Sequence, residues 1–69
     1  MTQKVEIGDG VSVELIFDGD SKTILGNFIG IIWSPPRGNR SWWAINGDCE
    51  DNYTYKEALK EIESSWAGS

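Results

Sequence analysis

The 69-residue chain contains no histidine and one cysteine. Histidine is the commonest general base and a frequent metal ligand, so its absence removes the usual route to acid-base catalysis and to transition-metal binding. A lone cysteine cannot form an internal disulfide, which fits a reducing compartment, and we expect a cytoplasmic protein. We therefore expect a protein that is not an enzyme and that carries no cofactor or metal.

The sequence also lacks a long hydrophobic run. Its longest apolar stretch, residues 28–33, is interrupted by Gly30 and is far shorter than the roughly 20 residues that a membrane helix requires. The first residues show neither the charged and apolar regions nor the cleavage pattern of a secretory signal. These absences predict a protein without a membrane partner.

Basic residues are few, with six against eleven acidic ones and a net charge of −5. Non-specific binding of nucleic acid depends on lysine and arginine, so the charge disfavours direct nucleic-acid binding and favours a partner protein with a basic surface. The charge is uneven. Residues 34–46 contain Arg37 and Arg40 without an acid, whereas residues 47–69 hold six acidic and two basic groups.

What the sequence does contain is 39% hydrophobic residues, including four tryptophans, which indicates one small globular domain over residues 1–69. Alternating apolar residues bounded by turn signals predict four strands. These strands cover about residues 3–8, 11–18, 23–33 and 41–46.

The last segment changes to a helical period. Apolar residues recur from Tyr55 to Trp66 at the spacing of one helix stripe, which predicts a helix over about residues 54–67. Thr54 and Glu57 have the spacing of a capping box at its start. The expected fold is therefore α+β in ββββα order: an antiparallel meander, flat or curled into a partial barrel, with the helix packed on one face.

Both faces of this sheet are expected to be apolar. Trp42 and Trp43 are adjacent in a strand and must point to opposite faces, and the strand over residues 23–33 is apolar on both sides. A four-residue loop before that strand would place one set under the helix, although a loop one residue longer or shorter reverses the faces. This set consists of Val13, Phe17, Ile24 and Phe28, with Gly26 and Gly30 admitting the helix close to the sheet.

The second face must be covered by closure of the sheet, by self-association or by a partner. Tryptophan and arginine are enriched at binding hot spots, and acidic groups attract a basic partner. We hypothesise a small protein-binding domain that occludes a surface of a larger protein, such as a phage- or mobile-element-encoded inhibitor or adaptor. The candidate binding residues are Trp33, Arg37, Arg40, Trp42, Trp43, Asp48, Glu50, Asp51, Glu57 and Glu61.

Two alternatives remain open. The hairpin with Arg37 and Arg40, together with the neighbouring tryptophans, would suit a small ligand or a single-stranded nucleic acid. A homodimer whose seam is the second sheet face is compatible with either function.

Overall fold

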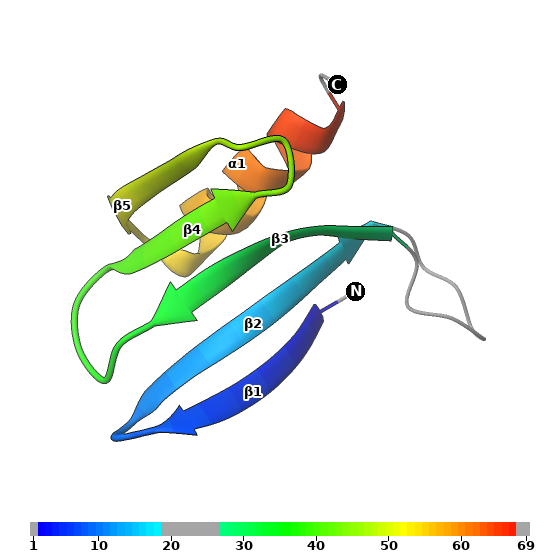
Figure 1. The fold of residues 1–69 in the computed structure, drawn as a ribbon. Helices are drawn as coiled ribbons and strands as arrows, with labels where there is room; N and C mark the ends of the chain where they lie inside the picture. Colours follow the sequence, from blue (N-terminus) through cyan, green and yellow to red (C-terminus); the bar gives the residue numbers. More distant parts are fainter. Residues whose placement is uncertain (1, 19–26, 68–69) are drawn as a thin grey trace.

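The computed structural model describes residues 2–18 and 27–67. They form five strands and one helix: β1 (Thr2–Gly8), β2 (Val11–Asp18), β3 (Asn27–Ser34), β4 (Arg40–Ala44), β5 (Cys49–Tyr53) and α1 (Tyr55–Ala67). The strands make one antiparallel sheet in the order of the sequence, and α1 packs behind β3, β4 and β5 (Figure 1). The fold is therefore α+β with a C-terminal helix, as predicted.

The strand number differs from the prediction, because the sheet has five strands rather than four. The additional strand, β5, lies between the fourth predicted strand, about residues 41–46, and the predicted helix, about residues 54–67. A turn at Asn46 and Gly47 reverses the chain, with the Gly47 amide donating to the Ala44 carbonyl at 2.9 Å and the Ala44 amide to that of Asp48 at 2.8 Å. Backbone pairing then makes β5 a strand, although its side chains lack the apolar alternation that identifies one.

The sheet is open rather than curled into a closed barrel, since β1 and β5 are its two edges among the described strands. β3 begins at Asn27, and residues 23–26 of the strand predicted there lie outside the described part of the chain. No helix within residues 2–18 and 27–67 has the length and apolar character needed to cross a membrane.

The helix begins where the capping signature predicted it. The Thr54 hydroxyl donates to Glu57 Oε1 at 2.7 Å and accepts a hydrogen bond from the Glu57 amide at 3.3 Å. These bonds satisfy an amide that the first helical turn leaves without a partner. The predicted apolar stripe faces the sheet, with Ala58 and Ile62 fully buried.

The core lies between α1 and the sheet. Ile62 packs directly over Gly30: a Cβ atom at Gly30 would lie 2.7 Å from Ile62 Cγ2 and 2.5 Å from the Trp43 carbonyl oxygen. The predicted role of Gly30 is thus confirmed, while Gly26 lies outside the described residues. The buried hydrophobic residues are Ile16, Ile29, Ile32, Trp42, Ala44, Ala58 and Ile62.

The predicted pairing of β2 with β3 is wrong. Val13 lies opposite Trp33 and Phe17 opposite Phe28, and the register shifts between Ile16 and Phe17. Ile32 and Trp42 lie in the core beneath α1, so their neighbours Trp33 and Trp43 lie on the other face. Val13, opposite Trp33, and the rings of Phe17 and Phe28, which lie beside Trp43, therefore point away from the helix. The predicted pairing placed Asp18 opposite residue 23, whereas Asp18 pairs with Asn27. The prediction of the face failed because the irregularity opposite Ile16 and Phe17 breaks the alternation of β3, so that Phe28 does not share the face of Gly30 and Ile32. The fourth residue of the predicted set, Ile24, lies outside the described residues.

Candidate functional site

The face of the sheet that α1 does not cover is apolar, and we call it the outer face. Two rows of directly opposed residues cross it, one running from β1 to β4 and one from β1 to β5. Neither row contains a charged side chain. The rows are Val5, Val13, Trp33 and Ser41, and Gln3, Leu15, Ile31, Trp43 and Cys49.

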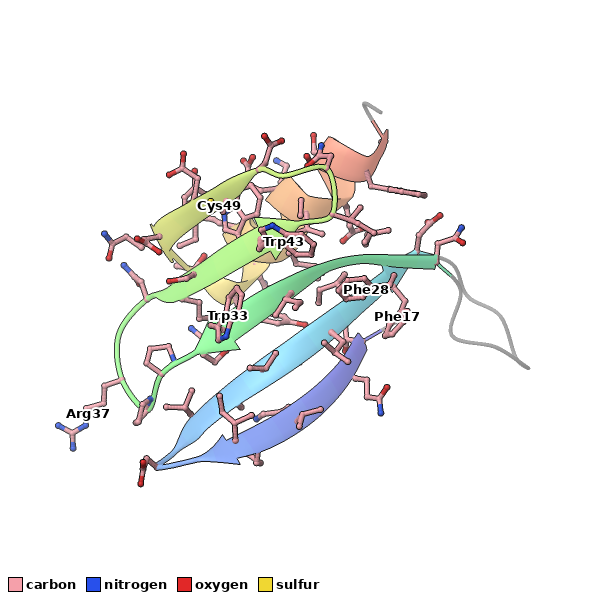
Figure 2. The ribbon with its side chains drawn as sticks, in the orientation of Figure 1. Phe17, Phe28, Trp33, Arg37, Trp43 and Cys49 are labelled. Carbon is pink, nitrogen blue, oxygen red and sulfur yellow. The ribbon has the colours of Figure 1, made fainter. Side chains whose placement is uncertain are left out.

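Aromatic rings continue this surface towards one end of the strands. The ring centroids of Phe17 and Phe28 lie 5.8 Å apart in an edge arrangement, and those of Phe28 and Trp43 lie 6.3 Å apart. Figure 2 shows these three side chains and Trp33 on the same side of the sheet. Trp33 is 41% exposed, although aromatic side chains of this size are normally buried for most of their surface.

As predicted, Trp42 and Trp43 point to opposite faces of the sheet. Trp42 is 4% exposed and meets Tyr53 edge-on at a centroid distance of 6.0 Å, so it belongs to the core and offers no surface for a ligand. Trp43 points to the outer face. Trp66, on α1, donates from its indole nitrogen to Asp18 Oδ2 at 3.0 Å and anchors the last helical turns to β2.

The structure does not bring the two candidate arginines together. Arg37 is exposed in the loop between β3 and β4 and extends into solvent (Figure 2). Arg40 begins β4 and precedes Ser41, which lies on the outer face, so Arg40 points to the helix side. An arginine and tryptophan clamp would need Arg40 on the same face as Trp33 and Trp43.

Arg40 instead lines a polar hollow of about 250 Å³ on the helix side, beside Glu14 and Tyr55. Glu14 Oε2 and Arg40 Nε are buried without a protein hydrogen-bond partner, and buried water commonly satisfies such atoms. Burial, a hydrogen bond to Glu14 and the charge of that carboxylate raise the pKa of Tyr55 to about 12. Two basic residues, Lys4 and Arg40, balance the two carboxylates that line the hollow, so it carries no net charge to attract an ion.

Two of the candidate acidic residues hold the fold together. Asp48 Oδ2 accepts a hydrogen bond at 2.7 Å from the Ser65 hydroxyl, which ties the β4–β5 turn to the end of α1. Glu57 takes part in the capping box. Both residues are exposed, so their charge also contributes to the surface potential.

The remaining acids gather around β5. Partial burial, and then the charges of Glu50, Glu61 and Glu57 in that order, raise the pKa of Tyr53. Glu50 lies opposite Trp42 and hence on the helix side, whereas Asp51 follows Cys49 by two residues and lies on the side of the outer face. The negative charge therefore borders the outer face at its β5 edge instead of surrounding it.

Metal-binding clusters were expected to be absent, and the finding here concerns residues 2–18 and 27–67 alone. These residues contain no cluster of three histidine, cysteine, aspartate or glutamate side chains that could hold an ion. Cys49 is exposed on the edge strand.

A larger hollow, of about 620 Å³, lies between the end of β2 and the second half of α1 and includes Lys60 and Glu63 in its lining.

The sequence analysis missed the contribution of the N-terminal hairpin to the outer face. Val5 and Ile7 are 41% and 58% exposed, yet they were not among the candidate residues. The length of the helix was the available signal. Thirteen residues of helix extend only about 20 Å, so α1 is too small to cover an apolar set that continues into the first two strands.

Comparison with known proteins gave no matching family model, no matching curated protein and no matching solved structure.

Proposed function

We propose that this chain is a small acidic protein-binding domain that occupies a surface of a larger, basic protein through the outer face. The observation that carries the proposal is an uncharged apolar face centred on Ile31, Trp33 and Trp43, which the helix leaves uncovered. Contiguous exposed apolar patches on small proteins mark interaction sites, and tryptophan is prominent among interface hot spots. The domain acts by stoichiometric occlusion.

Charge supports the same assignment. The net charge of −5 and the acids around β5 attract a basic partner, while the uncharged rows of the outer face avoid the cost of burying unpaired charges. Electrostatic steering chiefly raises the association rate, and apolar contact slows dissociation. Binding should therefore weaken in salt through slower association, with a smaller change in the dissociation rate.

The test is site-specific photo-crosslinking in host lysate followed by binding measurements on the purified partner. A photoreactive amino acid at the position of Trp33 should capture a basic protein, whereas the same group at Lys56, exposed on α1, should not. Trp33→Ser should then weaken affinity at least about tenfold, and Lys56→Ser should leave it unchanged. Trp33 is outside the buried core, so the variant should keep its circular dichroism spectrum and fold.

Two results would contradict the proposal. One is a partner that crosslinks equally from the two positions. The other is a captured partner whose affinity Trp33→Ser leaves unchanged, because the outer face would then contribute nothing to binding.

A further inference from the structure

The two edges of the sheet differ in how open they are to another strand. An edge strand presents unpaired backbone N–H and C=O groups, and natural proteins protect such edges with bulges, charges or covering elements. β5 has all three: the register shifts between Arg40 and Trp42 on its partner strand, Asn52 adopts a φ of 65°, and Glu50 and Asp51 lie on the strand. α1 also packs against it. This edge is closed to strand addition.

β1 has no shift in register over Thr2–Glu6, and its two charges, Lys4 and Glu6, are of opposite sign and can therefore pair with those of a second copy. All seven of its residues are exposed, and from Thr2 to Glu6 it pairs with β2 without a shift in register. The irregularity in the pairing comes only after Glu6, next to the turn. This regular stretch of five residues therefore lies at an edge of the sheet, with no described strand on its other side.

The sequence of β1 is complementary to itself. If two β1 strands pair in antiparallel fashion about Val5, Lys4 of each copy lies opposite Glu6 of the other, giving two symmetric pairs of opposite charge. In the single chain, Lys4 Nζ and Glu6 Oε1 are 3.8 Å apart, and their side chains are 62% and 68% exposed, so both are available to a second chain. We propose that β1 is a dimer interface at which two copies pair about Val5 into one ten-stranded sheet.

The symmetry of this pairing makes the assembly self-limiting. A two-fold axis through the Val5 pair uses the open edge of both copies, and the outermost strands of the dimer are the two protected β5 edges. Directly opposed residues share a face, so Val5 meets Val5 on the outer face and the helices remain together on the other side. The outer face stays accessible, and the inference does not depend on the proposed function.

The net charge of each chain does not oppose this contact. β1 carries Lys4 and Glu6 and is neutral overall, whereas many of the acids lie on β5 and α1. Four strand spacings separate β5 from β1, about 19 Å, which is roughly twice the screening length at physiological ionic strength.

Reversing the charges of Lys4 and Glu6 tests whether two β1 strands pair in this way. Sedimentation velocity of the wild-type chain from micromolar to millimolar concentration should show a reversible dimer. Lys4→Glu alone places carboxylates opposite each other at both pairs, and Glu6→Lys alone places ammonium groups opposite each other, so each should weaken dimerisation at least about tenfold. An equimolar mixture of the two variants restores opposite charges at both pairs and should dimerise like the wild type.

The matched controls are Lys56→Glu and Glu63→Lys, which make the same changes in net charge on exposed positions of α1 and should leave the dimer unchanged. Circular dichroism should confirm that every variant is folded. A wild-type chain that stays monomeric at millimolar concentration would overturn the proposal, as would a mixture that fails to recover. A dimer that Trp33→Ser dissolves and the β1 variants do not would place the interface on the outer face instead, and would equally overturn it.

Discussion

Ile31 and Ile32 are consecutive isoleucines of β3, yet their side chains lie in different environments. Ile32 is fully buried beneath α1 and lies opposite Trp42, whereas Ile31 lies opposite Trp43 on the outer face and remains partly exposed. The same contrast holds for the two tryptophans. A strand that is apolar on both sides thus contributes to folding on one face and offers a contact surface on the other.

The stability of this small domain originates mainly on the covered face. Removing apolar surface from water stabilises by roughly 25 cal/mol per Å², and the residues that are completely buried lie between α1 and strands β2, β3 and β4. The outer face retains much of its apolar surface in solvent. Substitutions on the two faces should therefore affect different properties: stability on the covered face and association on the outer face.

The largest effect is expected from truncating the covered side of β3. Ile32→Ala should lower the free energy of unfolding by about 2–5 kcal/mol, a large part of the roughly 3–10 kcal/mol expected for a domain of this size. Ile31→Ala should cost only about 1 kcal/mol. Urea titration followed by tryptophan fluorescence measures both values.

If Ile32→Ala does not fold, Ile32→Val and Ile31→Val provide the same comparison with smaller losses, about 0.5–1.5 kcal/mol on the covered side. Equal losses of stability from the two isoleucines would contradict this difference between the faces, because they would mean that the outer face is also covered in solution.

A smaller loss of stability is expected from Gly30→Ala. The added methyl group would lie 2.5 Å from the Trp43 carbonyl oxygen and 2.7 Å from Ile62 Cγ2, so the helix and β4 must move. Overpacking of this kind typically costs about 1–3 kcal/mol. Thermal unfolding by differential scanning calorimetry gives the change, and a melting temperature equal to the wild type would show that α1 does not approach the sheet this closely.

The smallest effect concerns the polar hollow on the helix side, where Tyr55 at the start of α1 lies beside Glu14 of β2. The folded-state pKa of Tyr55 is raised to about 12, against about 10 in the unfolded chain, and that of Tyr53 is also raised. Folding therefore favours the neutral phenols. The stability that Tyr55 contributes is complete below about pH 10 and is lost as the pH rises through about 12. The raised pKa of Tyr53 adds a loss of stability of the same sign above about pH 10.

Spectrophotometric titration of tyrosinate should show both tyrosines ionising above their pH of ionisation in denaturant. Glu14→Gln removes the neighbouring charge and should move the Tyr55 transition to lower pH. Titration of the folded protein at the denatured-state values would contradict the proximity of Tyr55 to Glu14.

The parts of the fold that depend on local signals were predictable. Thr54 and Glu57 marked the start of α1, and the spacing from Tyr55 to Trp66 identified the side that faces the sheet, because both features act within a few residues. β5 was not predictable in this way. Its residues from Cys49 to Tyr53 pair through the backbone to a neighbour across a turn, and such pairing leaves no periodic trace in exposed polar side chains.

The candidate site was predictable only in part. The expectation that one residue of the Trp42 and Trp43 pair points away from the helix followed from strand geometry and is confirmed. The other residues that line the outer face were not predicted correctly, since Val13, Phe17 and Phe28 were assigned to the core. Pairing between strands depends on contacts between distant residues, and the bulge next to Phe17 shifts the register without a local signal.

By itself, the sequence determined that the sheet has two apolar faces and that one helix is available to cover them. Alternation with a period of two places neighbouring residues on opposite sides in any register, so this conclusion needed no knowledge of the pairing. Which side the helix covers could not be read from the sequence, because a shift of one residue exchanges the faces of a whole strand. In the folded chain, Ile62 of α1 packs over Gly30 on the face of Ile32 and Trp42, and this leaves Trp33 and Trp43 on the open side.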